Sequence, residues 1–166
     1  MIVCLMGVSG SGKSTIGALL SQKLAYPFVE GDDYHSPVDK HKMSQGIPLN
    51  DADRFKWLRN LSSSFELGEN SKELVVACSS LKKSYRSVLR DTGHLIIFVH
   101  LQGDLRLIKE RLEQRTGHFF NPSLLDDQSK QLEPLGSDEK GFTVSIDQSI
   151  DLVVAEILGS LNDYPS

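Results

Sequence analysis

The sequence lacks the features that mark several large classes of protein. No apolar run approaches the roughly 18 residues of a membrane-spanning helix, so we expect no segment to cross a membrane. The N-terminus enters a strand-like run directly, so we expect no signal peptide. The two cysteines, Cys4 and Cys78, lie in apolar runs. We expect them to be buried free thiols in a reducing compartment, and not a disulfide or a metal site.

An excess of charge of one sign is also missing. The chain has 18 Lys and Arg against 22 Asp and Glu, a formal net charge of −4, which argues against a general binder of nucleic acid or of anionic membranes. Its 166 residues, with 39% apolar and 24% charged, suit one globular domain with a sizeable core. There is no internal repeat. We therefore expect a single domain, 1–166.

The most informative pattern that is present is Gly7–Ser14, GVSGSGKS, a full match to the phosphate-loop pattern G-x-x-x-x-G-K-[ST]. The apolar run Ile2–Met6 precedes it as an expected strand, and apolar residues follow it at helical spacing. In such a loop, backbone N–H groups and the start of a helix bind phosphate oxygens. Lys13 would reach the β- and γ-phosphates, and Ser14 would ligate Mg²⁺. The predicted nucleotide contacts are Gly7, Val8, Ser9, Gly10, Ser11, Gly12, Lys13 and Ser14.

Strands and helices alternate along the whole chain, which predicts an α/β fold with a parallel sheet between two layers of helices and right-handed crossovers. The expected strands are 2–6, 27–30, 74–78, 95–99 and 142–146. We expect residues 36–50 to be a loop with at most one helical turn. Asn50 and Asp104 are expected helix caps, Ser79 and Ser80 are expected to cap a helix over 81–91, and the last helix is expected to begin at Asp147.

Two missing motifs narrow the kind of nucleotide protein. There is no Asn-Lys-x-Asp signature for guanine, and the third expected strand ends in Ser79 where motor-type ATPases carry an aspartate. The carboxylate near Mg²⁺ or the nucleophile must then come from another strand. Asp32, after the second strand, is the best candidate, with its neighbour Asp33 as the alternative. A solvated turn is the non-functional interpretation of this pair.

Positive charge for a transferred phosphoryl group is expected from two helices. Lys82, Arg86 and Arg90 recur four residues apart with Lys83 beside them, and this stripe indicates an anionic ligand or, alternatively, a solvated basic face. Arg111 and Arg115 lead into a segment that begins at Thr116-Gly117-His118-Phe119. Such a segment could close as a lid and exclude water, although ordinary surface charge would look the same.

Several segments together resemble the small gluconokinases of the phosphate-loop type, which are relatives of shikimate and adenylate kinases. The resemblance covers nearly the whole chain, and its segments are Gly7–Thr15, Gly31-Asp32 with His35, Lys42-Met43, Gly46–Asp51, Asp53-Arg54 with Trp57-Leu58, Cys78-Ser79, Leu81–Lys83 with Tyr85-Arg86, Gly117–Phe119, Leu132–Pro134 and Asp147. It implies ATP-dependent phosphorylation of D-gluconate at its 6-hydroxyl, giving 6-phosphogluconate. It also implies a five-stranded sheet in the order 2-3-1-4-5, a substrate-binding segment near 32–60, a lid near 116–136, and a cytoplasmic homodimer.

The resemblance also implies roles for individual residues. Asp32 would orient or deprotonate the acceptor hydroxyl and would hold Mg²⁺ through water, with Ser14 as the direct ligand. The expected sugar-acid contacts are His35, Arg54, Lys83 and Arg86, with His118 near the γ-phosphate or the substrate. Arg111 and Arg115 would act on ATP, Arg111 in catalysis as well, and Thr15 would complete the nucleotide contacts. Glu30 stands where relatives usually carry Asp, and the lid matches more loosely than the rest.

Two other functions remain open from the sequence alone. One is a kinase for another small hydroxy acid or for a nucleoside monophosphate. A monophosphate site would call for several arginines, and residues 32–60 carry only Arg54 and Arg59. The other is a nucleotide-sensing module without turnover, against which the intact Lys13, Ser14 and Asp32 argue.

Overall fold

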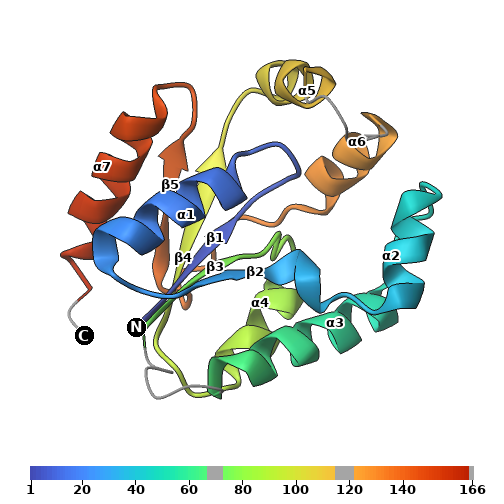
Figure 1. Ribbon diagram of the computed structural model, residues 1–166, viewed down its shortest axis with the longest axis horizontal. Helices are drawn as coiled ribbons and strands as arrows, with labels where there is room; N and C mark the ends of the chain where they lie inside the picture. The colour runs from blue at the N-terminus through green and yellow to red at the C-terminus, as the bar shows by residue number, and fades with distance from the viewer. Residues whose placement is uncertain (67–72, 115–121, 165–166) are drawn as a thin grey trace.

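The computed structural model describes residues 1–66, 73–114 and 122–164, which build a parallel sheet with helices on both faces (Figure 1). The five strands lie in the order β2-β3-β1-β4-β5. The strands are β1 (Ile2–Met6), β2 (Phe28–Glu30), β3 (Leu74–Ala77), β4 (Ile96–Gln102) and β5 (Gly141–Ser145). The helices are α1 (Lys13–Leu24), α2 (Pro37–Ser44), α3 (Asp51–Ser63), α4 (Lys83–Arg90), α5 (Leu105–Glu113), α6 (Pro122–Gln131) and α7 (Ile150–Leu161), with short 3-10 turns η1 (Gly31–Tyr34) and η2 (Ser64–Glu66).

The central strand β1 is buried on both faces, so its apolar residues serve two cores. Val3 and Leu5 face the core that includes residues of α1, α5 and α7. Ile2, Cys4 and Met6 face the core that includes residues of α3 and α4. Because side chains alternate along a strand, a continuous apolar run is what a sheet covered on both faces requires. The predicted three-layer α/β fold and the strand order are confirmed.

The strand register brings the expected site segments to one edge of the sheet. Met6, the last residue of β1, pairs with His100 of β4, and Leu5 pairs with Ala77 at the end of β3. Glu30, the last residue of β2, also pairs with Ala77. The loop after β1, the turn η1 and the segment after β3 therefore start from neighbouring positions at the carboxyl ends of parallel strands, where α/β folds bind ligands.

The expected loop over 36–50 was wrong, since eight of its residues form α2. The Ser36 side chain accepts a hydrogen bond from the Asp39 amide and caps this helix. Pro37 occupies the first turn, where its missing N–H costs nothing. Gly46 has a φ of 71° just beyond the helix end. The proline and glycine that suggested a loop thus mark the two ends of a helix.

Two helix starts also differ from expectation, whereas two caps are confirmed. Helix α4 begins at Lys83 and not at Leu81, because Lys82 has extended backbone angles (φ −97°, ψ 149°) and is itself the N-cap. The expected capping by Ser79 and Ser80 was therefore wrong. Helix α7 begins at Ile150, where Ser149 accepts a hydrogen bond from the Leu152 amide. Asp104 caps α5 as predicted. Among the described helices, none combines the length and apolar character needed to span a bilayer.

Asn50 caps α3 as predicted, and its contacts make a stability test. Its Oδ1 accepts from the Asp53 amide at 2.8 Å, while Asp53 Oδ2 accepts from the Asn50 amide at 3.3 Å. Asn50→Ala removes one half of this capping box and should lower the free energy of unfolding by about 1 kcal/mol. Urea denaturation measures the change.

The matched control is Asn60→Ala, at an exposed position of the same helix. There alanine is the better helix former, so stability should stay equal or rise by a few tenths of a kcal/mol, roughly. Equal losses in both variants would show that the cap does not stabilise α3.

Candidate active site

The phosphate loop between β1 and α1 has the backbone that its glycines predict. Gly7, Gly10 and Gly12 have φ values of 141°, 81° and 93°. A Cβ on Gly7 would lie 2.9 Å from the Leu101 carbonyl oxygen, so this position has no room for a side chain. The Lys13 ammonium donates to the carbonyls of Gly7 at 3.0 Å and Val8 at 2.9 Å. The loop therefore holds the lysine over its own concave side, where phosphates bind in loops of this type.

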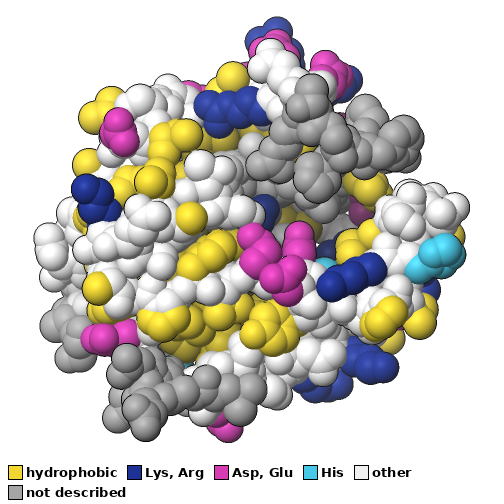
Figure 2. Space-filling model, viewed as in Figure 1, with side chains coloured by type: hydrophobic (Ala, Val, Ile, Leu, Met, Phe, Trp, Pro, Cys, Tyr) yellow, Lys and Arg dark blue, Asp and Glu magenta, His cyan; other side chains and the backbone are white. Residues whose placement is uncertain are grey.

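Asp32 and His35 form the acidic turn that follows β2. The Asp32 side chain is 77% exposed, and its Oδ1 lies 3.7 Å from His35 Nε2. The contact with His35, followed by the charge of Lys13, holds the pKa of Asp32 below its usual value. Asp32 is therefore an ionised acceptor beside the phosphate loop. Figure 2 shows acidic side chains gathered at the middle of this face, over the segment that follows β2.

His35 is fixed in place by the single tryptophan of the chain. The two rings stack with centroids 4.1 Å apart and planes at 17°, and Trp57 Nε1 donates to the Gly31 carbonyl at 2.7 Å. His35 is 7% exposed, and its Nδ1 is buried with no hydrogen-bond partner in the described part of the chain. A buried polar atom without a partner is costly, so this nitrogen is suited to a polar ligand in the adjacent pocket.

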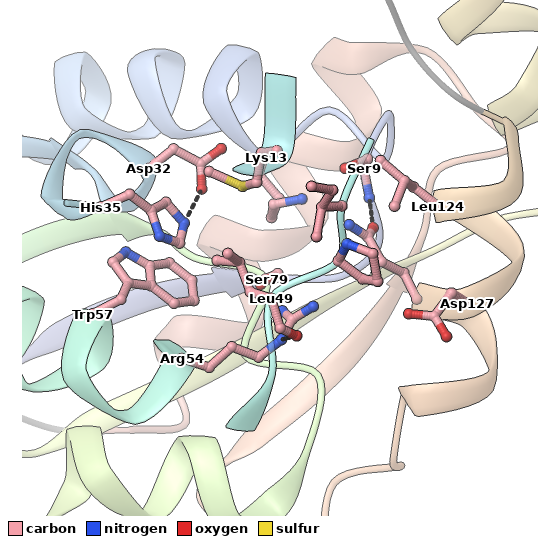
Figure 3. Close-up of a pocket in the computed structure, with 14 residues that line it drawn as sticks. Ser9, Lys13, Asp32, His35, Leu49, Arg54, Trp57, Ser79, Leu124 and Asp127 are labelled. Atoms are coloured by element: carbon pink, nitrogen blue, oxygen red, sulfur yellow. Dashed lines mark hydrogen bonds and ion pairs between the residues drawn. The ribbon is translucent and has the colours of Figure 1, made fainter. Parts of the chain in front are cut away.

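The pocket beside this turn runs from the phosphate loop to α3, and we call it the acceptor pocket (Figure 3). It is lined by Ser9, Lys13, Asp32, His35, Met43, Ile47, Pro48, Leu49, Arg54, Trp57, Ser79, Leu124, Asp127 and Gln128. Arg54 is 9% exposed, and its Nε donates to the Leu49 carbonyl at 3.3 Å. Within the described ranges no carboxylate forms an ion pair with Arg54. A buried guanidinium in this condition is suited to an anionic ligand.

A second pocket, which we call the base pocket, lies on the other side of the phosphate loop. Its lining comes from the loop, α1, α5 and α7 and consists of Gly10, Ser11, Gly12, Thr15, Ile16, Arg111, Ile146, Gln148, Ile150 and Val153. Arg111 donates to the Ile146 carbonyl at 3.2 Å, which holds its guanidinium at the pocket wall. Apolar side chains with one guanidinium suit a flat nucleotide base. The phosphate loop thus has a base pocket on one side and the acceptor pocket on the other.

Oxygen donors for a divalent cation meet between β2 and α1. Glu30 lies near Ser14, Asp32 and Lys13, which all influence its pKa. Burial raises the pKa of Glu30, and Ser14 and Lys13 oppose that effect. A hydroxyl and two carboxylates are the hard ligands that Mg²⁺ prefers, so these residues fit the ion. No separate group of three metal-ligating His, Cys, Asp or Glu side chains is found among the described residues.

The structure corrects the prediction that Arg86 contacts substrate. Arg86 is fully buried, and its Nε and Nη2 donate to the two carboxylate oxygens of Glu139 at 2.6 and 2.9 Å. Its remaining donors bind the carbonyls of Ser80, Leu81, Glu133 and Pro134. Every direction of the guanidinium fork is therefore used inside the protein, and none is left for a ligand.

Lys83 is also absent from the lining of the acceptor pocket. Its ammonium pairs with Asp138 at 2.7 Å, and its amide donates to Glu133 Oε2 at 2.6 Å. Asp33 is likewise not a lining residue, and its carbonyl accepts from Lys40. Arg115 and His118, with the first part of the expected lid, lie outside the described residues.

Several pocket residues were missed by sequence reasoning. Trp57 was noted only within a segment that carries the family resemblance, although a lone tryptophan beside charged residues could have drawn notice. Leu124, Asp127 and Gln128 lie in α6, within the segment expected as a lid near 116–136, but no individual role was expected for them. Ile146 and Gln148 follow β5, so their position at the carboxyl edge of the sheet was the available signal.

The fold, the phosphate loop and the paired pockets define a phosphate-loop kinase of small molecules. The family model of shikimate kinase matches residues 9–157. A probable gluconokinase of Xenopus tropicalis is 41% identical over 98% of this chain and 94% of its own length, and the thermoresistant gluconokinase of Escherichia coli K12 is 40% identical over 95% and 91%.

Solved structures agree with these sequence comparisons. A gluconokinase from Sinorhizobium meliloti 1021 superposes with a TM-score of 0.86 at 40% identity, covering 97% of this chain and 91% of that one. The APS kinase of Mycobacterium tuberculosis, 22% identical with a TM-score of 0.67 over 97% and 96%, shares the fold. The chain belongs to the gluconokinase family, within the wider group that the shikimate kinase model describes.

The buried pair of Arg86 and Glu139 leads to a stability prediction. Burial would raise the pKa of Glu139, but the hydrogen bonds from Arg86 and the Gly136 amide outweigh it and hold this pKa below its usual value. Arg86→Met leaves that carboxylate buried without its cation and should lower the free energy of unfolding by about 3–5 kcal/mol. Chemical denaturation measures the loss.

The control is Arg90→Met, one helical turn further along α4. Arg90 pairs with Asp138 at 3.3 Å, where both side chains are more than one-third exposed, so its loss should cost about 1 kcal/mol or less. If Arg86→Met proved as stable as Arg90→Met, the internal role assigned to Arg86 would be wrong.

Proposed function

We propose that this chain is a gluconokinase, which transfers the γ-phosphoryl group of ATP to the terminal 6-hydroxyl of D-gluconate. Membership of the family supports this function, and the observation that carries it in the structure is the state of Arg54. This guanidinium is buried at the wall of the acceptor pocket without a carboxylate partner among the described residues. A sugar acid would supply that carboxylate and, through its hydroxyls, a partner for His35 Nδ1.

The proposed reaction uses residues from both sides of the phosphate loop. ATP would lie with its base against Arg111 and its phosphates along Gly7–Thr15, so that the last phosphoryl group faces the acceptor pocket. Lys13 would stabilise negative charge on that group as it transfers. Asp32, kept ionised, would orient the 6-hydroxyl and accept its proton. Ser14 and Asp32, with Glu30 behind them, would hold a Mg²⁺ ion, which supplies charge neutralisation to the phosphates.

The resemblance to gluconokinases also supports a cytoplasmic homodimer, with no nucleic-acid or membrane partner. A nucleoside monophosphate is the less favourable acceptor, because its phosphate would call for several arginines. Of the two candidates in the substrate segment, Arg54 lines the acceptor pocket and Arg59 does not. Arg59 lies instead beside Ser62, Ser63 and Val88, between α3 and α4.

A coupled assay of ADP release tests the function. With Mg·ATP we expect turnover with D-gluconate and none with shikimate, glycerate or ribonucleoside monophosphates. Arg54→Met should raise the KM for gluconate by about 10- to 100-fold, since it removes hydrogen bonds to a charged group, and should leave the KM for ATP unchanged.

Arg59→Met is the matched control, an arginine lost from the exposed side of the same helix. It should leave both KM values within about twofold of wild type. Turnover with a different acceptor would reject gluconate as substrate, and an unchanged gluconate KM in Arg54→Met would remove Arg54 from the binding site.

The carboxylate is tested by a pair of neighbouring substitutions. Asp32→Asn should lower kcat by about 100- to 10,000-fold, because the amide cannot accept the hydroxyl proton, while ATP binding persists. Asp33→Asn removes the same charge one residue away, outside the pocket lining, and should leave kcat within about twofold. Steady-state kinetics on both variants measure the two kcat values. A larger loss of kcat in Asp33→Asn than in Asp32→Asn would show that Asp33, and not Asp32, is the catalytic carboxylate.

A further inference from the structure

A side chain of α6 is hydrogen-bonded to the phosphate loop. The Ser9 amide donates to Gln128 Oε1 at 2.7 Å, joining residues 119 positions apart in the sequence. Figure 3 draws this bond as the dashed line at Ser9, and Figure 1 places α6 beside the tip of the loop. Leu125 of the same helix is 2% exposed and belongs to the core cluster that also contains residues of α1 and α5, so α6 is anchored where Gln128 reaches the loop.

Ser9 lies at the end of the phosphate loop that borders the acceptor pocket. Gly10, Ser11, Gly12 and Thr15 line the base pocket, whereas Ser9 lines the acceptor pocket together with Lys13. The Ser9 amide thus lies at the end of the loop where the last phosphoryl group of a bound triphosphate would face the acceptor. Backbone amides of phosphate loops bind phosphate oxygens. The Gln128 carbonyl oxygen therefore accepts from a backbone amide of the kind that binds phosphate oxygens in such loops.

A carboxamide differs from a phosphate in having a donor as well as an acceptor. Phosphoryl oxygens are acceptors, so the Gln128 carbonyl cannot remain against Ser9 when such an oxygen arrives. Its NH₂ group, in contrast, is suited to that oxygen. Leu124 and Asp127, which also line the acceptor pocket, lie on the same side of α6 as Gln128. This face of the helix is therefore already directed toward the site of transfer.

We propose that Gln128 is a binding residue for the transferring phosphoryl group. In this structure its carbonyl accepts from Ser9. In the ATP complex its NH₂ donates to a γ-phosphoryl oxygen, so that α6 is held over the acceptor pocket by the third phosphate. This role rests on the proposed transfer from ATP. It predicts that Gln128 distinguishes ATP from ADP, because ADP lacks the group that it contacts.

The test compares Gln128→Glu with Gln128→Ala. Glutamate keeps the acceptor for Ser9 but has no NH₂ and brings negative charge toward the phosphoryl group, whereas alanine removes both functions. Calorimetric titration with ADP and with a non-hydrolysable ATP analogue, both with Mg²⁺, gives the two affinities. We expect Gln128→Glu to lower the affinity for the ATP analogue by about tenfold or more and the affinity for ADP by about twofold or less. We also expect its kcat to be lower than that of Gln128→Ala.

Gln22→Glu is the charge control, because it makes the same charge change at an exposed position of α1. Gln22 lines neither the acceptor pocket nor the base pocket, so the affinities for both nucleotides should stay within about twofold. Thermal unfolding of each variant confirms that it is folded.

Three outcomes would overturn the proposal. If Gln128→Glu matched wild type while Gln128→Ala was impaired, the side chain would serve only as an acceptor for Ser9. An equal loss of affinity for ADP and for the ATP analogue would mean that the substitution damages the phosphate loop as a whole. Wild-type behaviour of both variants would remove Gln128 from the site. Failure of the proposed function looks different, since wild-type protein would then not turn over gluconate whatever Gln128 does.

Discussion

The buried ion pair between Arg86 and Glu139 is the interaction on which the surroundings of the acceptor pocket depend. Arg86 binds the carbonyls of Ser80 and Leu81, and so fixes the segment that follows β3. The same guanidinium binds the carbonyls of Glu133 and Pro134, just after α6. Ser79 of the first segment lines the pocket, and α6 contributes three lining residues. One desolvated pair thereby sets the distance between two walls of the site.

Three polar groups near the phosphate loop are left incomplete by the rest of the fold. Among the described residues, Ser11 Oγ and His35 Nδ1 are buried with no hydrogen-bond partner, and Arg54 forms no ion pair, although its charge lowers the pKa values of Asp51 and Asp53. They lie on both sides of the loop, Ser11 in the base pocket and the other two in the acceptor pocket. Native proteins satisfy the hydrogen bonds of almost all buried polar groups. Several incompletely bonded polar groups at one edge of the sheet therefore indicate a binding site for polar ligands.

Local sequence patterns predicted the fold well, because a phosphate loop, apolar strands and helix caps depend on residues close together in the chain. Asn50 and Asp104 were recognised as caps for this reason. The basic stripe of Lys82, Lys83, Arg86 and Arg90 was misinterpreted because its acidic partners are distant in the sequence. Asp51 comes 31 positions before Lys82, and Asp138 and Glu139 come about 50 positions after the residues they pair with. Periodicity places Arg86 on a helix but cannot tell whether that face meets solvent or another segment.

The Gly7 amide donates to the Ser79 carbonyl at 3.2 Å, and the Leu101 carbonyl closes the space beside the Gly7 Cα. The conformation of this eight-residue motif therefore depends on backbone from much later in the chain, namely the segment after β3 and strand β4. During synthesis β1 leaves the ribosome first, yet its two neighbours in the sheet follow only after residues 74 and 96. A nascent chain that ends before them carries the full phosphate-loop sequence without its geometry. We therefore expect nucleotide affinity to appear late in synthesis and folding, after β3 and β4 have joined β1 in the sheet.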